Sequence, residues 1–162
     1  MTLPDIFTIG YEGAAIEDLI ATLRAAGVTR LVDIRHSPYS QRQEFSKDEL
    51  AAALAGYGIA YEHIRELGNP PAGREAARAG HMAAYREIFA AHLDSAEGRV
   101  GLNSLLTRAA GEPVCMLCFE RSASHCHRSM VAGRLETLSG HAIVHLKVTA
   151  RQPHPAQGSF GF

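Results

Sequence analysis

The sequence predicts a fold of the α/β class, and two observations carry that prediction. Short apolar stretches alternate along the chain with longer segments in which apolar residues recur at helical spacing. The stretch 113–119 is almost wholly apolar, as expected for a central parallel strand buried on both faces. Strand–helix alternation implies right-handed crossovers. We therefore expect a three-layer Rossmann-like domain, with a mainly parallel sheet of about five strands and helices on both faces.

The first half of the chain supplies three of the expected strands, at residues 5–9, at 30–34 and from 59 onward. Between the first two, apolar residues at helical spacing predict a helix, and Gly27 stands where its C-cap belongs. Before the third strand, Ser46 and Glu49 have the spacing of a capping box, which predicts a helix running to about Gly56.

The second half continues the alternation. We expect one helix over residues 76–92 and another around Leu102 and Leu106 that ends near Gly111. The strand at 113–119 follows, then a helix over residues 126–138 and a last strand at 142–146. Residues 1–150 are predicted to form a single domain, and 151–162, rich in proline, glycine and glutamine, read as a flexible or docked tail.

Composition narrows the class of protein. The 162 residues are 46% apolar and 20% charged, ordinary values for a globular protein. The formal net charge of −1 excludes an overall basic protein that coats nucleic acid through its bulk charge. No apolar run is long enough to cross a membrane, and the N-terminus lacks the features of a signal peptide. We expect a cytoplasmic protein without membrane contact.

Polar residues follow the predicted strands. Gly10 and Tyr11 follow the first strand, Arg35 and Ser37 the second, and Glu120 the fourth. Ligands of parallel α/β sheets bind beyond the carboxyl ends of the strands, so these segments should share one rim. We assign Gly10, Tyr11, Arg35 and Ser37 to substrate binding.

The run Cys126-His127-Arg128 adds a second group to that rim. With Ser124 as N-cap, it would occupy the first turn of a helix, where free N–H groups and the helix dipole favour an anion. The same field lowers the pKa of a thiol, so Cys126 is a candidate thiolate with His127 beside it, and Arg128 offers a planar fork to a phosphate. Alternatively, Cys126 packs beneath the helix and His127 caps it.

Two carboxylates are candidate acids or bases. Asp33 lies in an otherwise apolar strand and must be paired, with Arg35 or Arg128 as its partner, either in a catalytic site or in a structural ion pair. Glu120 ends the buried fourth strand, where burial can raise its pKa; otherwise it is a solvated strand end. We count Asp33, Glu120, Cys126 and His127 as the catalytic candidates.

Cys115 and Cys118, with His125, Cys126 and His127, have the composition of a zinc site. Side chains alternate faces along a strand, so Cys115 and Cys118 should point in opposite directions and cannot share a metal. We expect neither a metal nor a cofactor.

These motifs together resemble the domain-of-unknown-function family 488. The resemblance is carried by Leu31-Val32-Asp33-Ile34-Arg35, by Tyr61 and Leu67-Gly68, by Cys118-Phe119-Glu120 and by Cys126-His127-Arg128, and it extends from Thr8 to about Leu138. It implies a compact Rossmann-like α/β domain and no particular reaction.

The residues favour an enzyme, of hydrolase or transferase type, that acts on a phosphate-bearing substrate, either a nucleotide or a nucleic acid. The alternative is a binding module that uses the same pocket without chemistry. Two carboxylates and a thiol beside an anion site favour the enzyme, because a pure anion binder gains nothing from acidic groups there.

The end of the tail suggests a protein partner. The spacing of Gln157, Phe160 and Phe162 is similar to the short peptide by which bacterial DNA-repair and replication proteins bind the sliding clamp. The alternative is that the tail folds back and buries both rings on its own domain.

Overall fold

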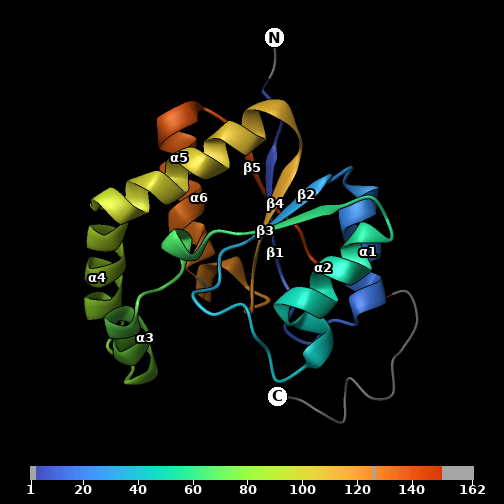
Figure 1. Ribbon diagram of the computed structural model, residues 1–162. Helices are drawn as coiled ribbons and strands as arrows, with labels where there is room; N and C mark the ends of the chain where they lie inside the picture. Colours follow the sequence, from blue (N-terminus) through green and yellow to red (C-terminus); the bar gives the residue numbers. More distant parts are fainter. Residues whose placement is uncertain (1–2, 126, 151–162) are drawn as a thin grey trace.

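The computed structural model describes residues 3–125 and 127–150. Its sheet contains five parallel strands in the order β3-β2-β4-β1-β5 (Figure 1). The strands are β1 (Ile6–Gly10), β2 (Arg30–Asp33), β3 (Ala60–His63), β4 (Val114–Cys118) and β5 (Ile143–His145). The helices are α1 (Ile16–Ala25), α2 (Lys47–Ala55), α3 (Pro71–Arg78), α4 (Met82–Asp94), α5 (Ala96–Gly111) and α6 (Arg128–Ser139). The predicted α/β fold with a parallel sheet of about five strands is confirmed.

The helices form two layers with the sheet between them. In Figure 1, α1 and α2 lie on one side of the sheet, and α4, α5 and α6 on the other. The central strand β4 is buried on both faces and alternates between two cores. Met116 and Cys118 pack in the core beneath α4, α5 and α6, whereas Cys115 and Leu117 pack in the core beneath α1 and α2. The predicted opposition of Cys115 and Cys118 is confirmed.

The strand order brings distant segments to one edge. Because β4 lies between β1 and β2, the carboxyl ends of all three strands meet there, with Gly10 beside Cys118 and Asp33 beside Leu117. A glycine is required at position 10, because a Cβ atom there would lie 1.7 Å from the backbone oxygen of Glu120. The chain leaving β1 therefore passes directly against the chain leaving β4.

Three local predictions are wrong. The expected helix over 76–92 is interrupted, because Gly80 adopts a left-handed conformation (φ +81°) and separates α3 from α4. Ser46 is the N-cap of α2 by position but makes no capping bond, since its hydroxyl is hydrogen-bonded to the backbone of Ser40. The last long helix begins at Arg128 rather than behind Ser124, which lies in a 3₁₀ turn (Ala123–His125).

None of the helices in the described part of the chain has the length and apolar character needed to cross a membrane.

Candidate functional site

A cavity of about 320 Å³ opens at the carboxyl edge of the sheet. Its walls come from the segments that follow β1, β2 and β4, from the loop that leads into α3, and from the residue before α6. The lining residues are Tyr11, Arg35, His36, Ser37, Tyr39, Asn69, Arg74, Phe119, Glu120 and His127. This cavity is the candidate functional site.

Asp33 does not line the cavity; it fixes the position of Arg35. Its side chain is fully buried and accepts hydrogen bonds from Arg35 Nε (2.8 Å) and Nη2 (2.6 Å) and from the Tyr61 hydroxyl (2.5 Å). Burial alone would lower the pKa of Arg35, but the hydrogen bonds and charge of Asp33 outweigh it and raise that pKa. The guanidinium is therefore charged and held in one orientation.

Tyr11 supports the same guanidinium from the end of β1. Arg35 Nη1 donates to the Tyr11 hydroxyl at 3.3 Å, and the guanidinium carbon lies 5.3 Å from the centre of the tyrosine ring. The ring of Tyr11 stacks on Phe45 and meets Phe119 edge to face, so it is held on both sides. Tyr11, Arg35 and Ser37 all line the cavity, at the edge where the sequence places them.

Two histidines hold the backbone at the end of β2. His127 Nε2 is 2.9 Å from the Ile34 carbonyl oxygen, and His63 Nε2 is 2.7 Å from that of Arg35. Burial lowers the pKa of His127 to about 4, so its ring is neutral at physiological pH and Nε2 donates its hydrogen to Ile34. His127 thus faces the cavity as a neutral ring that positions the Arg35 segment.

Glu120 is the carboxyl group that lines the cavity. Burial raises its pKa, and the negative charge of Glu12 adds to that effect, although a backbone hydrogen bond and the charge of Arg128 act against it. The charge of Glu120 in turn contributes to the raised pKa of Tyr85, which burial brings to about 12. The prediction that burial raises the pKa of Glu120 agrees with this environment.

Arg128 is not part of the pocket wall, and the prediction that it lines the same pocket is wrong. Its side chain is fully buried. Nη1 donates to Thr8 Oγ1 at 2.7 Å, Nη2 donates to the carbonyl oxygens of Glu120 (2.8 Å) and Arg121 (3.0 Å), and Nε lies 3.1 Å from Cys118 Sγ. These contacts fasten the start of α6 to β1 and to the chain leaving β4.

One further predicted residue, Gly10, lies elsewhere. Gly10 faces a neighbouring cavity of about 240 Å³, together with Glu12, Gly13 and Arg121, so its expected contact with substrate has no counterpart in the candidate site. The thiol candidate Cys126 lies outside the described residues, as do Gln157, Phe160 and Phe162 of the tail.

Sequence reasoning missed the wall formed by Tyr39, Asn69 and Arg74. Asn69 belongs to the loop that follows β3, and Arg74 lies in the second turn of α3. The rule that ligands bind beyond the strand ends covers this loop as well as the other three. Applying it to the segment Gly68-Asn69-Pro70-Pro71 would have found Asn69, whereas the approach of Arg74 depends on where α3 packs.

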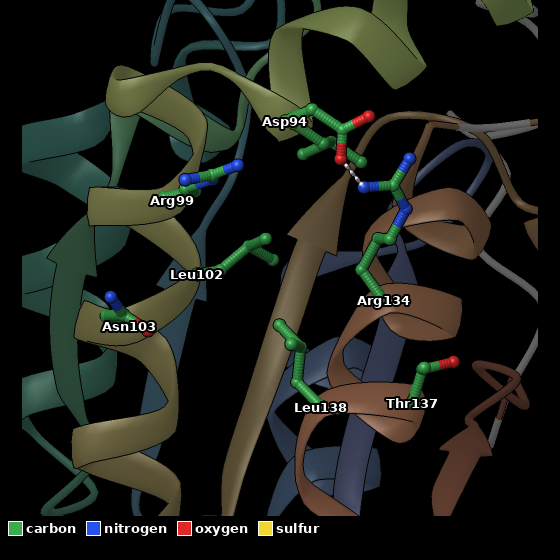
Figure 2. Close-up of a pocket in the computed structure, with 8 residues that line it drawn as sticks. Asp94, Arg99, Leu102, Asn103, Arg134, Thr137 and Leu138 are labelled. Atoms are coloured by element: carbon green, nitrogen blue, oxygen red, sulfur yellow. Dashed lines mark hydrogen bonds and ion pairs between the residues drawn. The ribbon is translucent and has the colours of Figure 1, made fainter.

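A second cavity, of about 460 Å³, lies on the side of the molecule covered by α4, α5 and α6 (Figure 2). Leu102 and Leu138 point into the gap between α5 and α6, and an ion pair between Asp94 and Arg134 lies at one end. The charges in that pair neutralise each other, and Arg134 lowers the pKa of Asp94. No carboxyl group with a raised pKa lines this cavity. Its carboxylate, Asp94, is exposed, so the cavity has no counterpart of the buried carboxyl group of the candidate site.

Fold and pocket together define a three-layer α/β protein with a polar pocket at the carboxyl edge of a parallel sheet. The chain belongs to the family described as domain of unknown function DUF488, whose model matches residues 15–135. This match confirms the resemblance seen in the sequence. Comparison with curated proteins gave no match, and neither did comparison with solved structures. Within the described residues, no three histidine, cysteine, aspartate or glutamate side chains gather as metal ligands.

Proposed function

We propose that this chain is an enzyme that acts on a phosphate-bearing substrate, a nucleotide or a nucleic acid, in the cavity lined by Arg35 and Glu120. One observation carries the proposal: a guanidinium held in place by a buried carboxylate lines the same cavity as a carboxyl group with a raised pKa. The first group suits the binding of an anion, and the second suits proton transfer.

The donors around the cavity suit phosphate oxygens. Arg35 uses Nε and Nη2 to pair with Asp33, and Nη1 contacts Tyr11, so one Nη1 hydrogen can still point to a ligand. Ser37 adds a hydroxyl and Arg74 a second guanidinium. Because Asp33 fixes Arg35 beforehand, little side-chain freedom is lost when an anion binds.

Glu120 is the proposed general acid. The raised pKa of Glu120 increases the fraction of this carboxyl group that carries a proton; in that form it does not repel a phosphate, and it can protonate the oxygen that leaves when water or an acceptor hydroxyl attacks. Asp33 and His127 are positioning residues in this scheme, because the first holds the Arg35 guanidinium and the second holds the Ile34 carbonyl. These positioning roles differ from those expected from the sequence, where both residues were catalytic candidates.

Glu120→Gln tests the proposal, because the amide keeps the shape of the side chain and loses the acidic proton. Ribonucleotides, deoxyribonucleotides and short single-stranded oligonucleotides are incubated with the protein, products are followed by ³¹P NMR, and affinity is measured by calorimetry. We expect turnover of a substrate found in this panel to fall by about 10²- to 10⁴-fold in the variant, with affinity retained.

Glu136→Gln, an exposed change in α6, is the matched control and should leave both quantities unchanged. Equal turnover by the Glu120→Gln variant would remove Glu120 from the reaction. Tight binding without turnover by the wild-type protein would instead establish the non-catalytic binding module, and the absence of binding by any phosphate compound would contradict both readings.

A further inference from the structure

Two polar atoms in the wall of the candidate site are buried and, among the described residues, have no hydrogen-bond partner. They are Asn69 Oδ1 and Arg74 Nε, and both side chains line the cavity that contains Arg35 and Glu120. Buried polar atoms in folded proteins are nearly always paired, so an acceptor and a donor left over in a pocket wall are points of attachment for a ligand.

Close packing around two glycines places the loop that carries Asn69. Gly68 lies against the segment after β2, because a Cβ atom there would come within 2.4 Å of His36 Cα. Gly73, buried in the first turn of α3, lies so close to Asn69 that a Cβ atom would be 2.1 Å from Oδ1. The amide oxygen is therefore fixed between the loop and the helix, beside the segment that carries Arg35.

The charge of this wall favours an anionic ligand. Burial lowers the pKa of His36, and the positive charges of Arg74 and Arg65 lower it further. A neutral His36 next to two guanidinium groups marks a positive corner of the pocket. Arg74 Nε–H should therefore donate to an anionic oxygen.

We propose that Asn69 and Arg74 form a subsite for a sugar phosphate, in which Asn69 binds a sugar hydroxyl and Arg74 binds a phosphate oxygen. The phosphate group of a monoester dianion offers only acceptors and would leave the Asn69 oxygen unpaired. A hydroxyl donates and accepts, so it satisfies the side-chain amide in either orientation. This inference rests on the proposed function and narrows its substrate to phosphates that carry a neighbouring hydroxyl.

The test compares small phosphate probes, among which glycerol 3-phosphate and n-propyl phosphate differ only in hydroxyl groups. Affinities of glycerol 3-phosphate, n-propyl phosphate, ribose 5-phosphate and inorganic phosphate are measured by NMR titration of the whole chain. We expect the wild-type protein to prefer glycerol 3-phosphate over n-propyl phosphate by about tenfold, the ratio that one hydrogen bond to a buried polar group supports. Asn69→Ala should bring the ratio close to one.

Gly73→Ala is a second, independent variant, because its methyl group displaces the Asn69 amide without removing any group that contacts ligand. It should abolish the same preference. Arg74→Gln should weaken glycerol 3-phosphate and n-propyl phosphate alike, by about tenfold, whereas Arg78→Gln, an exposed change one turn further along α3, should alter neither. Thermal unfolding of each variant identifies any loss of fold.

The outcomes separate the two proposals. If phosphate probes bind and Arg35→Lys weakens them, but the hydroxyl preference is absent or survives both Asn69→Ala and Gly73→Ala, the sugar-phosphate subsite is wrong and the proposed function stands. If no phosphate probe binds the wild-type protein, the proposed function fails and the subsite fails with it.

Discussion

Two fully buried charged side chains at the carboxyl edge of the sheet, Asp33 and Arg128, are held by specific partners. Asp33 is bound by Arg35 and Tyr61, and Arg128 by backbone carbonyls and the Thr8 hydroxyl. Removing the Asp33 carboxylate would leave the Arg35 guanidinium buried and unpaired, which typically costs about 3 to 5 kcal/mol. At the scale of single residues, therefore, charges that look catalytic in the sequence serve to hold the Arg35 segment and the start of α6.

His127 makes stability depend on pH. Its pKa is lowered by burial to about 4 in the folded chain, against an ordinary value near 6.5. As the pH falls from 6.5 to 4, the unfolded chain gains a proton at this position before the folded chain does, so folding stability decreases. We expect this residue to account for a loss on the order of 1 to 3 kcal/mol across that range, allowing for its partial contact with solvent.

Denaturant unfolding of the wild-type protein and of His127→Gln at several pH values measures the effect. The glutamine amide can still donate to Ile34, but it does not titrate, so the two stability curves should converge as the pH falls from 6.5 to 4. His81→Gln, which changes an exposed histidine, should run parallel to the wild type. Parallel curves for His127→Gln would show that folding does not lower the pKa of this ring.

At the scale of elements, glycine positions explain where helices begin and end. The apolar spacing around residues 76–92 continues smoothly through Gly80, so a periodic pattern alone predicts one helix. The left-handed conformation of Gly80 nevertheless turns the chain, and α4 packs against α3 as a separate helix (Figure 1). Because of this turn, α3 and α4 are separate helices, and Arg74 of α3 lines the pocket.

Helix α6 offers a matched pair of glycine substitutions. Gly133 lies in its exposed middle, and a Cβ atom there meets nothing within 4 Å, so Gly133→Ala should stabilise the protein by about 0.5 to 1 kcal/mol. Gly140 closes the helix with φ of +79°, so Gly140→Ala should destabilise it by about 1 kcal/mol. Urea unfolding measures the change in the free energy of unfolding for each variant, and we expect the two changes to have opposite signs. Equal changes would contradict the capping role of Gly140.

At the scale of the whole molecule, the site depends on the close approach of β1 and β4. A Cβ atom at Gly10 would lie 1.7 Å from the backbone oxygen and 2.5 Å from the backbone carbon of Glu120, and backbone atoms cannot move aside cheaply. Gly10→Ala should therefore cost about 3 kcal/mol or more and shift Glu120 within the pocket. The free energy of unfolding from urea titration provides the measurement.

Gly56→Ala is the control for that substitution. Gly56 ends α2 with ordinary helical angles, and its nearest obstacle is 3.4 Å away, so the change should stay within about 0.5 kcal/mol. If Gly10→Ala proves as harmless as Gly56→Ala, the chains leaving β1 and β4 do not meet as closely as described here.

The sequence by itself determined the α/β class, the parallel sheet, the opposed faces of Cys115 and Cys118, and the edge at which the candidate cavity lies. These features follow from hydrophobic periodicity and from the alternation of strands and helices along the chain, both of which are visible in short stretches of sequence. Only the tertiary structure decided that Arg128 is buried while Asn69 and Arg74 line the pocket. Arg128 is bonded to Thr8, 120 positions away, and Arg74 reaches the cavity through the packing of α3. The burial of Arg128 and the position of Arg74 depend on contacts between residues far apart in the sequence, and a local sequence pattern holds no information about such contacts.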